Sequence, residues 1–159
     1  MPHEPKILGA IMLKGISPLI TPELLYALSA MGHGDSLVIA DANFPAKRIA
    51  ASHTLVHLPK VGVAELLQEI VKLIPVDALH EDPGYVMAMD PRDRVRLGGE
   101  PEIWKQYLKV LKTEHQGTKL GLIERMAFYE EASKAQTVVL TGDMTPYANI
   151  ILYKGVIEL

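Results

Sequence analysis

The feature that most constrains the fold is a regular alternation along the chain between short apolar runs and amphipathic segments of helical period. Five runs have the length and composition of buried strands. They cover residues 36–41, 85–90, 120–124, 137–142 and 147–155. Four segments repeat apolar residues at the spacing of one helix face. They cover residues 21–31, 62–75, 101–117 and 127–135. This alternation predicts an α/β sandwich, a single domain over residues 1–159 whose β-sheet is covered by helices.

The first of these helices carries recognisable capping residues. Thr21 has the side chain of an N-cap, Pro22 suits the first helical position, and Glu23 favours the positive end of the helix dipole. Gly32 is typical of a helix end. We therefore expect a helix that begins after Thr21 and ends at Gly32.

Charge and composition exclude several classes of protein. The 159 residues have a formal charge of −3 and a pI near 6.1, with no long run of one sign, so neither nucleic acid nor an anionic membrane is an expected partner. No segment approaches the roughly 18 apolar residues that a membrane span needs. Cysteine is absent, which excludes disulfides, thiolate metal sites and cysteine nucleophiles. A cytoplasmic protein is the expectation.

The sequence Gly-His-Gly-Asp at residues 32–35 places a histidine between two glycines. A P-loop needs a lysine and a Ser or Thr after its second glycine, and a dinucleotide fingerprint needs a small residue where Leu37 stands, so neither phosphate loop is present. The flanking glycines leave the His33 imidazole accessible, and histidine is the natural proton carrier near neutral pH. Asp35 and Asp41, the nearest carboxylates in sequence, could orient that imidazole, hold a substrate hydroxyl or cap a turn. From the residues alone, an ordinary turn is favoured and a catalytic histidine is the alternative.

The other five histidines do not form a convincing metal site. His53 and His57 would lie about 13 Å apart on one face of an extended segment. Were the segment helical, no third ligand lies at a useful spacing. His3, His80 and His115 lie in polar or terminal contexts. We expect surface histidines and no metal.

Arg125 lies where a predicted strand meets a predicted helix, one turn before Phe128 and Tyr129. An arginine in this position can donate several hydrogen bonds to a neutral polyol or an anion, while an aromatic ring can stack on the C–H face of a sugar. The alternative is a surface ion pair for the arginine and a core position for both rings.

The last predicted strand begins with alternating polar residues. By the period of two along a strand, Tyr147 and Asn149 share one side and Ala148 faces the other. Hydroxyl and amide groups at the start of an apolar strand suggest a polar pocket there.

Four blocks of the chain resemble the RbsD/FucU family of D-ribose pyranases and L-fucose mutarotases in both order and spacing. They are MLKGISPLITPELLYALSAMGHGD, IADANFPA, IERMAFYEEASKA and YANIILYKGV. The resemblance extends from about residue 11 to residue 156, and the GHGD block after the PELL helix is its most specific part. The D-x-[HN]-F-P-A and R-x-x-F-Y-E patterns are closer to the L-fucose mutarotase branch.

The resemblance implies an isomerase that interconverts the α and β anomers of a free monosaccharide, with L-fucose as the expected substrate, and that uses no cofactor and no metal. It makes His33 the proton donor. The residues that it implies for sugar binding are Asp41, Arg125, Tyr147, Ala148 through its backbone, and Asn149. Members of the family form rings of subunits, often decamers, with each site built across a subunit boundary. A homo-oligomer is therefore expected, in which Tyr147 serves a neighbour's His33.

The chain departs from the family pattern at three places. Asn43 stands where some fucose mutarotases have histidine, Ala148 replaces the glycine of Y-G-N, and residues 47–62 lack the acidic and arginine-containing block of this branch. Two other functions stay open at this point: a non-catalytic monosaccharide-binding protein in transport or regulation, and a pyranase that interconverts pyranose and furanose forms. A metal-dependent hydrolase is a distant third.

Overall fold

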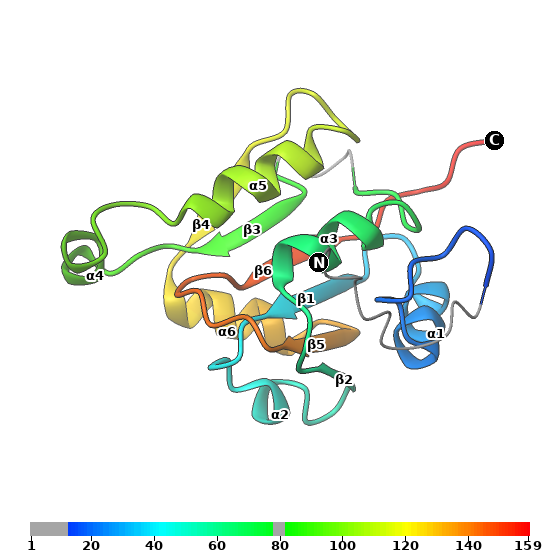
Figure 1. The fold of residues 1–159 in the computed structure, drawn as a ribbon, viewed down its shortest axis with the longest axis horizontal. Coiled ribbons are helices and arrows are strands. Elements are labelled where there is room, and N and C mark those ends of the chain that lie inside the picture. The colour runs from blue at the N-terminus through cyan, green and yellow to red at the C-terminus, as the bar shows by residue number, and fades with distance from the viewer. Residues whose placement is uncertain (1–12, 78–81) are drawn as a thin grey trace, which may run out of the picture.

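Five mutually parallel strands and one antiparallel strand form a mixed sheet at the centre of the molecule (Figure 1). The computed structural model describes residues 13–77 and 82–159, so His3 and His80 lie outside the described residues. The spatial order is β2-β5-β1-β6-β3-β4, and β6 is the antiparallel strand. The strands are β1 (Ser36–Ala40), β2 (Thr54–Leu58), β3 (Gly84–Met87), β4 (Leu120–Ile123), β5 (Thr137–Thr141) and β6 (Ile150–Tyr153).

Helices cover both faces of this sheet, which confirms the predicted α/β sandwich. They are α1 (Pro22–Ala30), α2 (Ala46–Ile49), α3 (Val63–Ile70), α4 (Pro91–Arg96), α5 (Glu102–Leu111) and α6 (Arg125–Ser133). Successive side chains of a strand point to opposite faces, so Leu37 of β1 joins the core beneath α1, α3 and α5, and Val38 joins the core beneath α2 and α6. Within the described residues, no helix is long and apolar enough to cross a membrane.

The strand directions bring distant loops to the same edge of the sheet. The carboxyl ends of β1, β3, β4 and β5 and the amino end of β6 lie together, and we name this side the carboxyl edge. The amino end of β1 and the carboxyl end of β6 lie on the opposite side, the amino edge. In open α/β sheets, ligands bind in the crevice outside the carboxyl ends of the strands.

The predicted cap of the first helix is confirmed, while its end differs by two residues. The Thr21 hydroxyl accepts a hydrogen bond of 3.3 Å from the Leu24 N–H, and Pro22 opens α1. The helix ends at Ala30, and Met31 has the extended backbone of a chain that turns away, so Gly32 belongs to the following turn.

Two short helices were not predicted from the sequence. Helix α2 has a single turn, and α4 buries none of its side chains. The predicted strand at 85–90 therefore ends early, at Met87, and Asp90 instead caps α4 by accepting from the Arg92 N–H at 2.8 Å. Figure 1 shows α4 at one end of the molecule, apart from the other helices.

The predicted strand over 147–155 is wrong at its start. Strand β6 begins only at Ile150, and Tyr147 has a φ of +59°, a left-handed conformation that side chains other than glycine seldom adopt. Of the surface histidines, His53 and His57 are exposed as predicted. His115 is half-buried instead, with its Nε2 atom 3.2 Å from the Val76 carbonyl oxygen.

Candidate functional site

A cavity of about 280 Å³ opens at the carboxyl edge and gathers residues from across the sequence. Asp41 follows β1, Arg125 opens α6 after β4, and Tyr147 and Asn149 precede β6; all four line the cavity. We name it the carboxyl-edge cavity. Four of the five residues expected to bind sugar thus lie in one place. Ala148 is fully buried between two of them.

The floor of this cavity is a buried pair of polar side chains. The Asn149 Oδ1 atom accepts a hydrogen bond of 2.7 Å from the Asp41 N–H, and the Asp41 Oδ1 atom accepts one of 2.9 Å from the Asn43 N–H. Burial raises the pKa of the Asp41 carboxyl, and the hydrogen bonds that the carboxylate accepts, that from the Asn43 N–H first, oppose the rise only in part. Asp41 and Asn149 are 6% and 5% exposed, so the fold fixes both positions.

The loop before β6 is held by two aromatic side chains of α5. The Trp104 indole N–H donates to the Tyr147 carbonyl at 2.9 Å, and the Tyr107 hydroxyl donates to the Ala148 carbonyl at 2.6 Å. Because Tyr107 is fully buried, burial raises its pKa far above the usual range and the phenol stays protonated as a donor. The two bonds hold Tyr147 in its unusual conformation. The common side of Tyr147 and Asn149 therefore comes from a clamped loop, and the strand alternation predicted there is absent.

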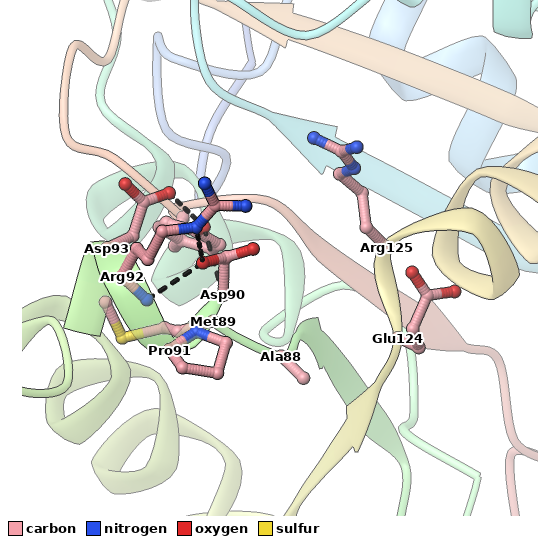
Figure 2. A pocket seen from close by; sticks show the side chains of 9 residues that line it. Ala88, Met89, Asp90, Pro91, Arg92, Asp93, Glu124 and Arg125 are labelled. Carbon is pink, nitrogen blue, oxygen red and sulfur yellow. Dashed lines mark hydrogen bonds and ion pairs between the residues drawn. The ribbon is translucent and has the colours of Figure 1, made fainter.

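Arg125 reaches a second, larger cavity as well. A hollow of about 550 Å³ lies beside the first and shares Asp93, Arg125 and Tyr147 with it. Figure 2 shows the side chains of Asp90 and Asp93 on one side of this hollow and that of Arg125 on the other. Among the described residues, the Arg125 guanidinium has no ion-pair partner, so the surface ion pair weighed from the sequence is not formed.

Aromatic rings form one wall of the carboxyl-edge cavity. Phe44 and Tyr129 both line it, with ring centroids 5.7 Å apart. Phe128 is fully buried behind them, 6.1 Å from Phe44. The sequence left both aromatics of α6 open between core and site, and the structure divides them: Phe128 belongs to the core and Tyr129 to the cavity. Asn43 also lines the cavity.

His33 lies at the amino edge, away from these residues. Gly34 has a φ of +83°, which favours glycine, and the Asp35 Oδ2 atom accepts from the Gly32 N–H at 2.7 Å. Asp35 therefore caps the turn, and Asp41 follows the far end of β1. The five residues of β1 span roughly 17 Å, so His33 does not meet the carboxyl-edge cavity within one chain. The His33 imidazole is 47% exposed.

A carboxylate that sequence reasoning missed lies beside this histidine. The His33 Nε2 atom is 3.6 Å from the Asp77 Oδ2 atom, and the Asp77 side chain is 6% exposed. Both residues line a cavity of about 630 Å³ at the amino edge. The Asp77 N–H donates to the Tyr153 carbonyl at 2.9 Å, which docks this segment against the end of β6. No local pattern in the sequence indicates a contact between two residues so far apart along the chain.

Helix α4 supplies two further residues that were not anticipated. Asp93 and Arg96 line the carboxyl-edge cavity. The signal available in the sequence was Asp90 followed by Pro91, a typical N-cap and first helical residue.

The chemistry that the described residues offer is that of hydrogen bonds and proton transfer. No group of three or more His, Asp or Glu side chains in the described part of the chain could hold a metal ion. The carboxyl-edge cavity combines a carboxylate, an amide, a phenol and a guanidinium with aromatic rings. Such a set suits a small polyhydroxylated molecule that has both hydroxyl groups and a C–H face.

Comparison with known proteins gives a consistent result. The model of the RbsD / FucU transport protein family matches residues 14–157. The chain is 43% identical over 150 residues to the fucose mutarotase of Homo sapiens, covering 94% of this chain and 97% of that protein.

Two solved structures are also similar. The crystal structure of FucU from Bifidobacterium longum has a TM-score of 0.85 and 40% identity, covering 91% of this chain and all of that one. The fucose mutarotase from Streptococcus pneumoniae, solved in complex with L-fucose, has a TM-score of 0.81 and 37% identity, covering 92% of this chain and all of that one.

Proposed function

Since the chain belongs to the RbsD/FucU family, we propose that it is an isomerase that interconverts the α and β anomers of L-fucose. The observation that carries this proposal is the carboxyl-edge cavity, where Asp41, Arg125, Tyr147 and Asn149 converge in a chain closely similar to fucose mutarotases. The size and polarity of this cavity fit a monosaccharide.

The reaction needs two proton transfers. Opening a cyclic hemiacetal places a proton on the ring oxygen and removes one from the anomeric hydroxyl, and closure on the other face of the aldehyde reverses both. An imidazole that gives and takes protons near neutral pH contributes typically 10²–10⁴-fold to such a step. We assign the role of proton donor to His33. Neither cofactor nor metal is required.

The remaining residues position the sugar. Asp41 accepts hydrogen bonds from sugar hydroxyls, Arg125 donates to them, and Tyr147, Asn149 and the Ala148 backbone line the same pocket. Tyr129 offers a ring on which the C–H face of the sugar can stack. Holding the hydroxyls in one orientation lowers the entropic part of the barrier.

His33 has to come from a second subunit in this account. It lies at the amino edge of its own chain, at the opposite end of β1 from Asp41. A homo-oligomer in which the amino edge of one subunit faces the carboxyl edge of the next brings the two halves together. We propose a ring assembly of this kind, a decamer as the resemblance implies, located in the cytoplasm.

The test is NMR saturation transfer between the α and β anomeric protons of L-fucose. The expected result is exchange accelerated by the protein and reduced by 10²-fold or more in His33→Gln. His57→Gln is the matched control, because His57 is exposed on an edge strand and lines no described cavity. Unaccelerated exchange with intact protein would refute the mutarotase proposal.

A binding protein is the second candidate, because the matching family is described as a transport family. The same His33→Gln variant separates the two functions. A pure binder retains its affinity for L-fucose in this variant and accelerates exchange in neither form. Signals of furanose forms in the same spectra report on the pyranase alternative.

A further inference from the structure

Tyr147 stands out among the cavity residues because its hydroxyl group is already engaged. It donates to the Asp93 Oδ2 atom at 2.6 Å and accepts from the Asp90 N–H at 3.3 Å. A phenol has one hydrogen to donate and two lone pairs to accept with. With both of these hydrogen bonds formed, the Tyr147 hydroxyl can offer a ligand in the cavity one lone pair and no hydrogen.

Asp93 is itself held in a defined orientation. Its Oδ1 atom accepts two hydrogen bonds from Arg96, from Nη2 at 2.9 Å and from Nε at 3.2 Å, while its Oδ2 atom accepts from Tyr147. The hydrogen bonds from Tyr147 and Arg96 lower the pKa of the Asp93 carboxyl, so it is ionised at neutral pH. An ionised carboxylate is the stronger acceptor, and it holds the phenol hydrogen firmly.

We infer that Asp93 is a positioning residue that commits the Tyr147 hydroxyl to act as a hydrogen-bond acceptor toward the sugar. With its own hydrogen on Asp93, Tyr147 receives the hydrogen of a sugar hydroxyl. Arg96 completes the arrangement by fixing the carboxylate. This inference rests on the proposed function, because it names what a residue of the proposed sugar site does.

The helix that carries Asp93 has no other evident task in the described residues. None of its side chains is buried, and Val95 on it is 83% exposed, so α4 adds little to the core. Among the described residues, Arg94 pairs with Glu100 in the loop that follows α4, and the side-chain hydrogen bond that links α4 to a distant part of the chain is the one that the Tyr147 hydroxyl donates to Asp93. Because α4 is exposed and is linked to the cavity through the Asp93 carboxylate, we assign it a role in the site and not in the stability of the fold.

A double-mutant cycle in L-fucose anomer exchange tests the inference. If Asp93 acts through the Tyr147 hydroxyl, Asp93→Ala slows exchange by about tenfold to a hundredfold in the intact protein and has no further effect in Tyr147→Phe. An equal loss in both backgrounds would overturn it. Arg94→Gln is the control on the same helix, because the Arg94 side chain pairs with Glu100.

A second readout needs no sugar. Burial and the hydrogen bond to Asp93 raise the pKa of Tyr147, and Asp90 and Asp93 are the charged groups that face its hydroxyl from α4. Subtracting the 295 nm titration of Tyr147→Phe from that of the intact protein isolates this one tyrosine. Asp93→Ala is expected to lower its pKa, and an unchanged midpoint would contradict the link.

The two readouts separate the inference from the function on which it rests. If the intact protein fails to accelerate exchange of L-fucose, the proposed function fails, and the tyrosine titration still decides whether Asp93 controls Tyr147. Asp93→Leu, which has a similar volume and no hydrogen-bond acceptor, replaces Asp93→Ala in both measurements if circular dichroism shows that the alanine variant is unfolded.

Discussion

The carboxyl edge of the sheet buries polar residues, whereas the amino edge leaves its histidine exposed. At the carboxyl edge, Asp41 and Asn149 are buried, and the Asn149 side chain accepts a hydrogen bond from the Asp41 N–H. At the amino edge, His33 is half-exposed on a glycine turn, with Asp77 beside it. The fold therefore holds in place the groups proposed to orient the sugar, and it leaves the proposed proton donor accessible to a second subunit.

This contrast predicts that mutations at the carboxyl edge cost stability as well as activity. Asn149→Ala removes the acceptor of the buried Asp41 N–H, so the free energy of unfolding should fall by about 1–3 kcal/mol. Urea unfolding measures the loss. Asn43→Ala is the matched control, since its exposed side chain lines the same cavity. Equal stability of Asn149→Ala and the intact protein would mean that this edge is not preorganised.

At the amino edge, the backbone conformation of the glycine turn should contribute to stability. Gly34 has a φ of +83° and open space around a Cβ, so Gly34→Ala should lower the free energy of unfolding by about 1 kcal/mol through backbone strain alone. Gly117→Ala also meets open space, without a positive φ, and should change stability little or raise it slightly. Thermal unfolding compares the two, and equal effects would show that the turn is not strained.

The smallest effect concerns the pH dependence of stability. Burial raises the pKa of Asp41 above the value of 3.8 of an ordinary carboxyl, so the folded state binds its proton more tightly than the unfolded state does. The contribution of Asp41 to the free energy of unfolding is therefore fully present below pH 3.8 and is lost as the pH rises through the pKa of the folded state. Asp41→Asn should remove this fall, which urea unfolding between pH 3 and about 7 measures. An unchanged slope in the variant would contradict the burial of a charged Asp41.

The sequence predicts those helices and strands in which apolar residues recur with a regular period. Capped, amphipathic α1 and the β-branched run of β1 follow from local rules, as does the α/β layering. Helix α4 could not be predicted from periodicity, because it buries no side chain. Alternation places the start of β6 wrongly, because polar and apolar residues alternate in a loop whose conformation is set by Trp104 and Tyr107, far away in the sequence.

The candidate site, too, could be predicted from the sequence only in part. His33, Asp41, Arg125 and Asn149 could be named from residue type together with resemblance to a family. The approach of Asp77 to His33 could not, because it depends on the pairing of Val76 with Lys154. Tertiary pairing decides such contacts, and a single sequence carries no record of it.

Subunit complementation between the two edges tests whether His33 and Arg125 of different subunits form one site. His33→Gln and Arg125→Met, each expected to be inactive alone, are co-expressed with different tags, and mixed assemblies are assayed for L-fucose anomer exchange. If each site joins two subunits, random mixing restores about a quarter of the sites. The control mixes intact chain with the double variant and should also give about a quarter.

A site contained within one subunit gives a different pair of results. The two single variants then restore no activity together, and the control mixture retains about half. We expect the first pattern; the second would show that His33 and the carboxyl-edge cavity do not meet across a subunit boundary.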